Sequence, residues 1–260
     1  MLLLANSSKI RYSYGMNIVL FTHDDNNFFP QNDERTKHIL KVLHKKMGET
    51  FEAGIENGLS GIATITKIDE TGLYFTFTAT GEGKPLHNVE MIIGFVRPIQ
   101  LKRLFRDMAS LGVRKIHLVA TELGEKSYMD SKIVERGTAY NALREGTIQA
   151  KSTHVPELCI HTSVENCIKS LNLENGIKVC LDNIEPKTTL FSFLGQKNAE
   201  FTQNSTIFAA IGSERGWSFK ERMLFEENKF TLCSMGNRVL RTETASTVAV
   251  SLMLQAKGEL

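Results

Sequence analysis

The chain has 260 residues, of which 42% are hydrophobic and 23% are charged. This composition is typical of a globular protein with a buried core and excludes fibrous and disordered chains. The 31 Lys and Arg residues nearly balance the 29 Asp and Glu residues, so any nucleic-acid binding must come from local basic patches rather than from bulk charge.

Cysteine usage and hydropathy indicate the compartment. The four cysteines form no CxxC pair and no histidine stands at zinc-finger spacing, so neither a metal site nor a disulfide framework is expected. The apolar start, Met1 to Ala5, is too short for a signal peptide, and no later run is long enough to cross a bilayer. We therefore expect a cytoplasmic protein without a membrane partner.

The first part of the chain predicts a small β-rich unit over residues 16–85. Residues 16–21 read as a second start, so residues 1–15 are expected to be an unstructured extension. Residues 34–47 show a short helical pattern crowded with Lys and Arg, and residues 62–68 and 73–78 read as a hairpin around a glycine turn. Gly81 to Pro85 interrupts both periodicities and marks a domain boundary.

The remainder, residues 88–260, predicts an α/β domain. Nearly continuous apolar runs of this kind are typical of parallel strands buried on both faces; they cover residues 91–96, 116–120, 177–181 and 207–211. Helical patterns alternate with these runs, which favours a mostly parallel sheet covered by helices.

Two helices of this domain have readable boundaries. Pro98 stands at a first helical position and Gly112 at a stop, and Lys102, Arg103 and Arg106 lie opposite the apolar stripe between them. The last helix is predicted from about residue 243 to 255. Its predicted apolar stripe consists of Ala245, Val248, Ala249, Leu252, Met253 and Ala256.

Two glycine-containing loops follow strand-like runs near the C-terminus. The first, residues 212–218, ends in a capping box formed by Ser218 and Glu221. The second, residues 236–241, follows the run 230–235 and precedes the last helix. Ligands of α/β sheets bind at the carboxyl ends of strands, so the loops predict a ligand site rich in main-chain groups. The alternative is that each glycine serves only its turn.

These loops resemble one known family. Residues 212–218, Gly-Ser-Glu-Arg-Gly-Trp-Ser, are similar to the Gly-Pro-Glu-Gly-Gly-aromatic-Ser loop of the RsmE family. Residues 235–245 are similar to its Leu-Gly-x-Arg-Ile-Leu-Arg-x-Glu-Thr-Ala segment. Weaker likeness at residues 38–43 and 111–116 extends the resemblance over most of residues 16–260.

The resemblance implies both a fold and an activity. The fold is a SPOUT-type α/β domain with a mostly parallel sheet and a C-terminal trefoil knot, preceded by a PUA-like β-barrel. Such a knot could not be inferred from periodicity, and knots are rare. The implied protein is a homodimer that binds S-adenosyl-L-methionine and methylates N3 of a uridine in 16S rRNA of the small ribosomal subunit.

The resemblance also assigns a cofactor pocket built from main-chain groups and apolar walls. The expected cofactor-binding residues are Leu181, Ile211, Gly212, Ser213, Glu214, Gly216, Met235, Gly236, Asn237, Val239 and Leu240.

Methyl transfer depends chiefly on positioning the two substrates in line. The N3 proton of uridine is only weakly acidic, so a base must take it or a cation must stabilise the anion. Arg241 and Glu214 are the candidate catalytic residues. Alternatively, Glu214 only satisfies loop amides and Arg241 only pairs with Glu243.

The residues expected to contact RNA phosphates share a basic side chain on a surface helix or next to one; they are Arg35, Lys37, Lys41, Arg97, Lys102, Arg103 and Arg106. A solvated helix face is the alternative for each patch. Trp217 and Phe219 are expected to pack their loop onto the core rather than stack on a base. The seven histidines form no ligand-spaced set, and none is expected to be catalytic.

Several family positions differ in this chain. Residues 145–152 lack the second Glu and the Arg of the family pattern, residues 107–112 match only partly, and Ser213 replaces a proline. Two other functions therefore stay open: a divergent SPOUT methyltransferase with another RNA target, and a non-catalytic RNA-binding or ribosome-assembly protein. A Rossmann oxidoreductase is disfavoured because no Gly-x-Gly-x-x-Gly follows an early strand.

Overall fold

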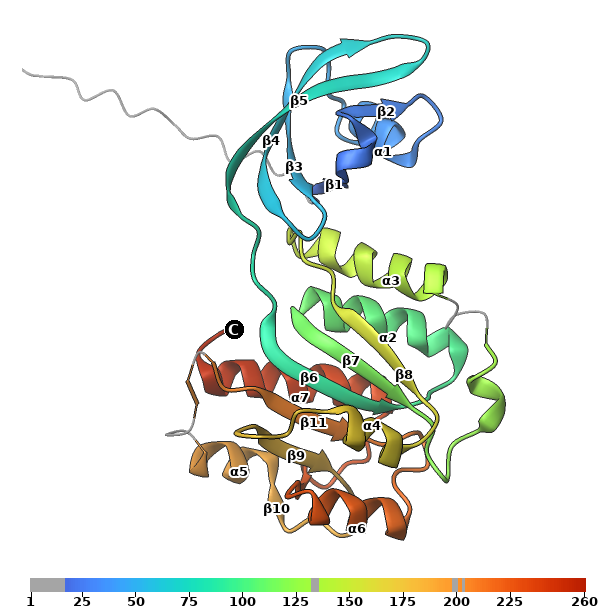
Figure 1. Cartoon of the computed structure of the whole chain (residues 1–260), viewed down its shortest axis with the longest axis vertical. Coiled ribbons are helices and arrows are strands. Elements are labelled where there is room, and N and C mark those ends of the chain that lie inside the picture. The colour runs from blue at the N-terminus through green and yellow to red at the C-terminus, as the bar shows by residue number, and fades with distance from the viewer. Residues whose placement is uncertain (1–16, 132–135, 198–200, 203) are drawn as a thin grey trace, which may run out of the picture.

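A computed structural model of the chain describes residues 17–131, 136–197, 201–202 and 204–260. These residues form two sheets, and the smaller sheet stands at one end of the larger one (Figure 1). Residues 83–86 connect them as one extended segment. The extension predicted for residues 1–15 lies outside the described residues.

The smaller sheet has five strands in the order β1-β3-β4-β5-β2. Its members are β1 (Val19–Phe21), β2 (Phe28–Pro30), β3 (Thr50–Ile55), β4 (Leu59–Ile68) and β5 (Gly72–Glu82). The predicted hairpin is confirmed as the antiparallel pair β4 and β5, and two register shifts interrupt that pair. Such bulges bend a strand, and the sheet curls around a core of aromatic and aliphatic side chains.

The helix predicted for residues 34–47 is shorter than expected. A single turn of α-helix, α1 (Glu34–Lys37), continues into a π-helical turn, η2 (His38–Val42), and ends there. The chain then reverses so that the amide of Gly48 donates to the carbonyl of Ile65 on β4. This return to the sheet stops the helix, although the apolar and basic periodicity continues to Met47.

The larger sheet has seven parallel strands in the order β10-β12-β9-β11-β6-β7-β8. The strands are β6 (His87–Gly94), β7 (Val113–Val119), β8 (Glu157–His161), β9 (Ile177–Leu181), β10 (Thr188–Thr189), β11 (Ile207–Ile211) and β12 (Thr231–Ser234). The predicted parallel α/β architecture is therefore confirmed. The predicted runs 177–181 and 207–211 coincide with β9 and β11.

Helices cover both faces of this sheet (Figure 1). One face packs against α2 (Pro98–Ser110), α3 (Arg136–Gln149), α5 (Leu190–Gln196) and α7 (Thr242–Lys257). The other packs against α4 (Val164–Ser170) and α6 (Phe219–Glu227). Two further single turns are η1 (His23–Asp25) and η3 (Lys126–Tyr128). No helix in the described ranges is long and apolar enough to cross a membrane.

The predicted apolar stripe of the last helix is partly wrong. Ala245, Ala249 and Met253 are buried as predicted, but Val248 and Leu252 are 37% and 40% exposed. The buried face is instead turned toward Ser246, Val250 and Leu254. Ser246 can be buried because its hydroxyl donates to the carbonyl of Thr242, one turn earlier.

Hydrogen bonds join the two sheets. The hydroxyl of Thr153 donates to the carbonyl of Gly58 at 2.6 Å, and the amide of Asn57 donates to the carbonyl of Thr153 at 2.8 Å. From α3, Arg144 donates to the carboxylate of Glu56 at 2.6 Å. These contacts come from the segment after α3 and from α3 itself, the helix that lies beneath the small sheet in Figure 1.

Candidate functional site

The carboxyl ends of β9, β11 and β12 surround a cavity of about 430 Å³. Its walls come from three connections that follow these neighbouring parallel strands: residues 181–184, residues 211–216 and residues 235–242. The volume lies within the range of small-molecule pockets, about 300–1,000 Å³. The position at adjacent strand ends is where α/β sheets bind ligands.

Nine of the eleven predicted cofactor-binding residues line this cavity, namely Leu181, Ile211, Gly212, Ser213, Glu214, Gly216, Met235, Val239 and Leu240. Gly236 and Asn237 belong to the same loop but lie outside the lining. Lining residues that the sequence did not indicate are Asp182, Asn183, Ile184, Arg215, Arg238, Thr242 and Ala245. Arg241, predicted as catalytic, also lines the cavity.

The two loops need glycine for different reasons. A Cβ on Gly212 would lie 2.8 Å from the Cα of Gly216, because the loop folds back on itself there. Gly236 has open space around it but a φ of +111°, a backbone conformation that side chains with a Cβ rarely adopt. Gly212 thus permits a tight turn, and Gly236 permits an unusual backbone direction.

The first loop is held by buried polar contacts. The indole of Trp217, fully buried, donates to the carbonyl of Leu181 at 3.2 Å. The capping box of Ser218 and Glu221 is confirmed, and Glu221 also accepts from the amide of Glu122 at 2.9 Å. Burial raises the pKa of Glu221 although the amide hydrogen bonds oppose it. The loop is therefore fixed to the end of β9 on one side and to the segment after β7 on the other.

A buried ion pair that sequence analysis missed shapes the opposite wall. The guanidinium of Arg222 on α6 donates to the carboxylate of Asp182 at 3.0 Å, and both side chains are almost inaccessible. The same carboxylate accepts from the amides of Ile184 and Glu185. Because Asp182 and Arg222 are 40 positions apart, no local spacing could have indicated the pair.

A second cavity of about 340 Å³ adjoins the first and has a more polar lining. It shares Ser213, Glu214, Arg215 and Arg241 with the first cavity. Its other side is formed by the start of α2 with Arg97 and Gln100, by residues 123–125 and 128, and by Glu243. The two candidate catalytic residues therefore stand between an apolar chamber and a polar one.

Glu214 and Arg241 have different surroundings. The carboxylate of Glu214 accepts from the backbone amide of Arg97 at 3.3 Å and lies 3.8 Å from the Arg97 guanidinium. Glu214 thus binds the start of α2. The amide from which it accepts a hydrogen bond, that of Arg97, lies outside the loop that carries Glu214. Arg241 is exposed at the start of α7 and makes no ion pair with any carboxylate in the described ranges, Glu243 included.

The thiol adjacent to the second loop is not a nucleophile. Cys233 is buried at the end of β12, and burial raises the pKa of its thiol to about 12. A thiol with such a pKa stays protonated near neutral pH.

The basic residues predicted on α2 are exposed, but acidic neighbours accompany them. Lys102 and Arg106 both pair with Glu145 of α3, and Arg103 lies 3.7 Å from the carboxylate of Asp107. Ion pairs this exposed are worth about 0–1 kcal/mol, so these cations can still exchange their partners for phosphates. Arg97 is exposed at the second cavity.

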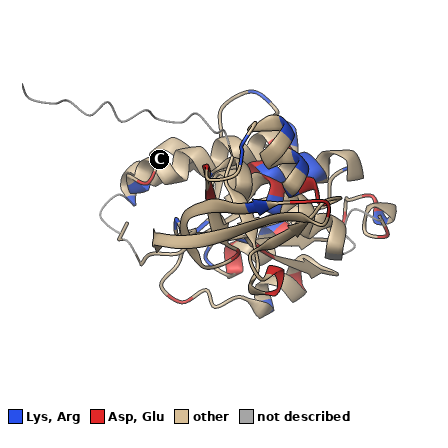
Figure 2. Ribbon diagram, turned by 90° about the horizontal axis from the view of Figure 1, so that it is seen from above, with Lys and Arg blue, Asp and Glu red and all other residues tan. Residues whose placement is uncertain are grey.

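The basic cluster predicted on the small sheet is reduced by one member. Arg35 lies between Asp25 and Asp33, donates to both carboxylates, and stacks on the ring of Phe29 at 4.0 Å. It supports the sheet and does not form a free basic edge. Lys37 pairs with exposed Glu34, and Lys41 is exposed. From above, Figure 2 shows basic and acidic positions close together.

The two aromatic residues of the first loop differ from each other. Trp217 packs against Phe225 in the core, as predicted. Phe219 is 67% exposed, so the prediction that it packs onto the core is wrong. As the first residue of α6, it projects from the capped end of the helix instead of into the sheet.

Comparison with known proteins agrees with this geometry. A family model described as RNA methyltransferase domain matches residues 82–254. The chain is 38% identical to Ribosomal RNA small subunit methyltransferase E of Treponema pallidum, over 92% of this chain and 91% of that protein. It is 32% identical to Ribosomal RNA small subunit methyltransferase E 1 of Borreliella burgdorferi, over 93% and 98% of the two chains.

Among solved structures, Ribosomal RNA small subunit methyltransferase E from Neisseria gonorrhoeae, crystallised with S-adenosyl methionine, has a TM-score of 0.74 and 18% identity. The likeness covers 92% of this chain and 97% of that one, and at this identity it supports the fold alone. The family match and the two relatives above 30% identity decide the assignment. The chain belongs to the RsmE family, the ribosomal RNA small subunit methyltransferases E.

Proposed function

We propose that this chain transfers the methyl group of S-adenosyl-L-methionine to N3 of a uridine in 16S rRNA. The observation that carries the proposal is the pair of adjoining cavities, one largely apolar and one polar, with Arg241 and Glu214 between them. A cofactor in the first chamber and a base in the second would meet at this shared wall. The names of the relatives support the substrate class.

The first cavity fits the cofactor in size and chemistry. Leu181, Ile211, Met235 and Leu240 supply apolar surface, and the two glycine-containing loops supply main-chain donors and acceptors. When bound there, S-adenosyl-L-methionine supplies an electrophilic methyl group. The protein's own contribution is to hold the acceptor nitrogen in line with that group and away from water.

Arg241 is proposed to stabilise the anion that forms at the base when the N3 proton passes to solvent water. A guanidinium stays charged at neutral pH and cannot act as a base, but it can stabilise negative charge in a sheltered site. Arg241 suits this role because no described carboxylate neutralises it. Glu214 is proposed to position Arg97 and the start of α2, through its contact with the Arg97 amide.

Single-turnover methylation with saturating cofactor tests this role. Removing one preorganised charge from a site costs about 10²–10³ in rate, so Arg241→Ala should lose activity on that scale, and Arg241→Lys should recover part of it. Lys169→Ala is the control, because Lys169 is an exposed cation on α4 and lines neither cavity. A wild-type rate in Arg241→Ala would remove the chemical role.

Mass spectrometry of digested 16S rRNA tests the target. Small subunits from a strain without the gene are incubated with the protein and labelled cofactor, and the modified base is located. Label on another RNA or another base would support the divergent methyltransferase instead. Absence of cofactor binding by calorimetry would support a non-catalytic RNA-binding or assembly protein.

The RNA is proposed to lie along α2 and to reach the small sheet. Arg97, Lys102, Arg103 and Arg106 are exposed on or beside α2, and Lys37 and Lys41 stand on the N-terminal helical turns. Each phosphate contact removed should reduce the slope of log affinity against log salt by about 0.7–0.9. Lys102→Ala with Arg103→Ala should show this, whereas Lys169→Ala on the opposite face should not.

The family's finer structural features are also part of the proposal. Residues 16–85 would be a PUA-like RNA-binding domain and residues 88–260 the knotted SPOUT domain. The strand order supports threading: β12 lies between β9 and β10, so residues 182–187 pass across the end of a strand that enters later in the sequence. The chain then leaves through residues 235–241 to reach α7.

A homodimer is proposed to cover the exposed side of α7. Val248 and Leu252 are one turn apart on that helix and remain partly exposed. Burying them against a second copy of the chain would explain why apolar side chains lie on the side of α7 that faces away from the sheet. Light scattering should therefore report a dimer for the wild type and a monomer for Val248→Glu, with circular dichroism confirming that the variant is folded.

A further inference from the structure

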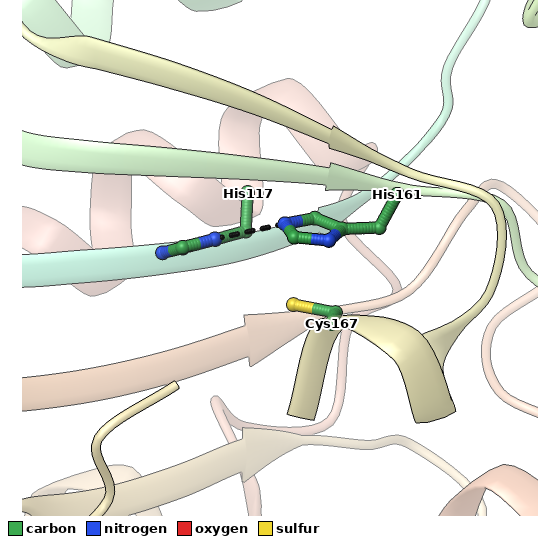
Figure 3. Close-up of side chains that lie close together, drawn as sticks. All are labelled: His117, His161 and Cys167. Atoms are coloured by element: carbon green, nitrogen blue, oxygen red, sulfur yellow. Dashed lines mark hydrogen bonds between the residues drawn. The ribbon is translucent and has the colours of Figure 1, made fainter. Parts of the chain in front are cut away.

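Away from both cavities, three potential metal ligands converge on the face of the seven-stranded sheet that α4 covers (Figure 3). They are His117 on β7, His161 at the end of β8 and Cys167 on α4. One ligand atom from each lies within 4.8 Å of the others, and Nδ1 of His117 is 3.0 Å from Nε2 of His161. Figure 3 shows the thiol directed toward the two rings.

The fold brings these residues together through strand register. His117 pairs with Cys159 across β7 and β8, and β8 ends two residues later, so His161 projects from the same face as His117. Ser163 then caps α4, which places Cys167 one turn into that helix. His117 and His161 are 44 positions apart in the sequence, so spacing alone could not reveal the cluster.

A buried carboxylate orients the first histidine. Nε2 of His117 lies 3.1 Å from the carboxylate of Glu90 on β6, which Arg114 also contacts. A carboxylate accepts hydrogen bonds, so its contact with His117 requires the proton on Nε2 of the ring. Nε2 therefore carries the proton, and Nδ1 presents its lone pair to His161 and Cys167.

This arrangement is the one found around metal-binding histidines. Such a histidine generally donates its other ring nitrogen to a carboxylate, which sets the tautomer and the ring orientation. Nδ1 of His117, Nε2 of His161 and the thiol of Cys167 face one another closely enough for one ion to bind all three. The Glu90 contact is thus an observation independent of the cluster itself, and it points to a ligand at Nδ1.

The distances are compatible with zinc. Zinc bonds of about 2.0–2.1 Å to nitrogen and 2.3 Å to sulfur imply ligand-to-ligand separations of about 3.3–3.6 Å in a tetrahedron. The observed 3.0 Å between nitrogens is about 0.3 Å short of these values, and the 4.8 Å limit for the set exceeds them by at most about 1.5 Å. Binding would therefore require the three side chains to rotate toward the ion.

We propose that His117, His161 and Cys167 bind one Zn²⁺ ion, or a divalent transition-metal ion of its class, with water as the fourth ligand. A mixed histidine and thiolate set suits borderline-soft ions such as zinc, whereas Mg²⁺ and Ca²⁺ prefer oxygen. His161 is only partly buried, which gives the ion access from solvent.

The ion would join three elements at the edge of the sheet. β8 is the edge strand, and α4 covers the junction of β7 and β8. A ligand that binds the folded state and not the unfolded state stabilises the folded state. One ion bound to all three elements would therefore stabilise this edge of the sheet. The site is separate from the proposed methyl-transfer chambers, none of whose lining residues belongs to it.

Cobalt binding to the full-length protein tests the proposal. Chelator-treated wild type titrated with Co²⁺ should give one equivalent of a complex with a thiolate-to-cobalt charge-transfer band in the near ultraviolet, and Zn²⁺ should displace it. Cys167→Ala should lose the band, and His161→Ala should weaken binding at least tenfold. Zn²⁺ should also raise the melting temperature of the wild type but not of Cys167→Ala.

Two matched variants provide the controls. Cys159→Ser removes the neighbouring thiol, which contacts Glu157 instead, and His23→Ala removes an exposed histidine of the turn η1. Both should keep the band and the affinity. A wild type without a charge-transfer band at saturating Co²⁺, a band that survives in Cys167→Ala, or one lost in Cys159→Ser would each overturn the assignment. The wild-type spectrum decides even if a variant fails to fold.

Discussion

Gly212→Ala is the smallest substitution that tests whether the first loop shapes the cofactor chamber. The added Cβ would lie 2.8 Å from both the Cα and the carbonyl carbon of Gly216, whereas ordinary contact begins at 3.4 Å. Both neighbours are main-chain atoms, so the turn must move by about 0.6 Å. Overpacking of this kind costs about 1–3 kcal/mol of the free energy of unfolding.

The same displacement should weaken cofactor binding, because Ser213 and Gly216 line the chamber. We expect the Kd for S-adenosyl-L-methionine, measured by calorimetry, to rise about tenfold or more, equivalent to about 1.4 kcal/mol. Gly195→Ala is the control: it lies in α5 with open space beside it, and should add about 0.5–1 kcal/mol of stability without changing Kd. Equal Kd values for wild type and Gly212→Ala would refute the reasoning.

Three further predictions concern the contacts that hold the site and the small sheet. Trp217→Phe leaves the carbonyl at the end of β9 buried without its donor, so urea titration should show a loss of about 1–3 kcal/mol; an unchanged midpoint contradicts this. Arg222→Met leaves the Asp182 carboxylate buried and unpaired and should cost about 3–5 kcal/mol, much of it recovered when both residues are made apolar; a double variant as unstable as the single one argues against the pair. Hydrogen bonds from Arg35 lower the pKa of Asp33, so their stabilisation is complete above the ordinary Asp value of about 3.9 and is lost as pH falls through the lowered pKa. Arg35→Met should therefore flatten the acid dependence of stability, and an unaltered acid limb would exclude this coupling.

Local pattern was sufficient for the buried strands and for several helix ends. β9 and β11 begin and end at their predicted residues because strands buried on both faces are continuously apolar. Pro98 and the Ser218 capping box marked helix starts for reasons that act within a single turn. The resemblance in the two loops then indicated the family, and the matches to relatives over most of the chain agree with it.

Elements with weak or mixed patterns were not predicted. β8 is an edge strand without a fully buried residue, and α3 carries Gly146 in its interior. That glycine is explained only by packing: a Cβ there would collide with the main chain of α2 at Arg106. The buried face of α7 was predicted only in part for a related reason. The elements that pack against this helix determine which of its faces is buried.

Local sequence was therefore sufficient for the continuously apolar strands, several helix ends, the glycine-containing loops and the family, since each is recorded in residues close together along the chain. Tertiary structure alone decided which distant side chains meet. The Asp182 ion pair, the shared wall of Glu214 and Arg241, and the cluster of His117, His161 and Cys167 all depend on strand order and register. The physical reason is that polar contacts act over a few ångströms in space, whereas periodicity records only neighbours along the chain.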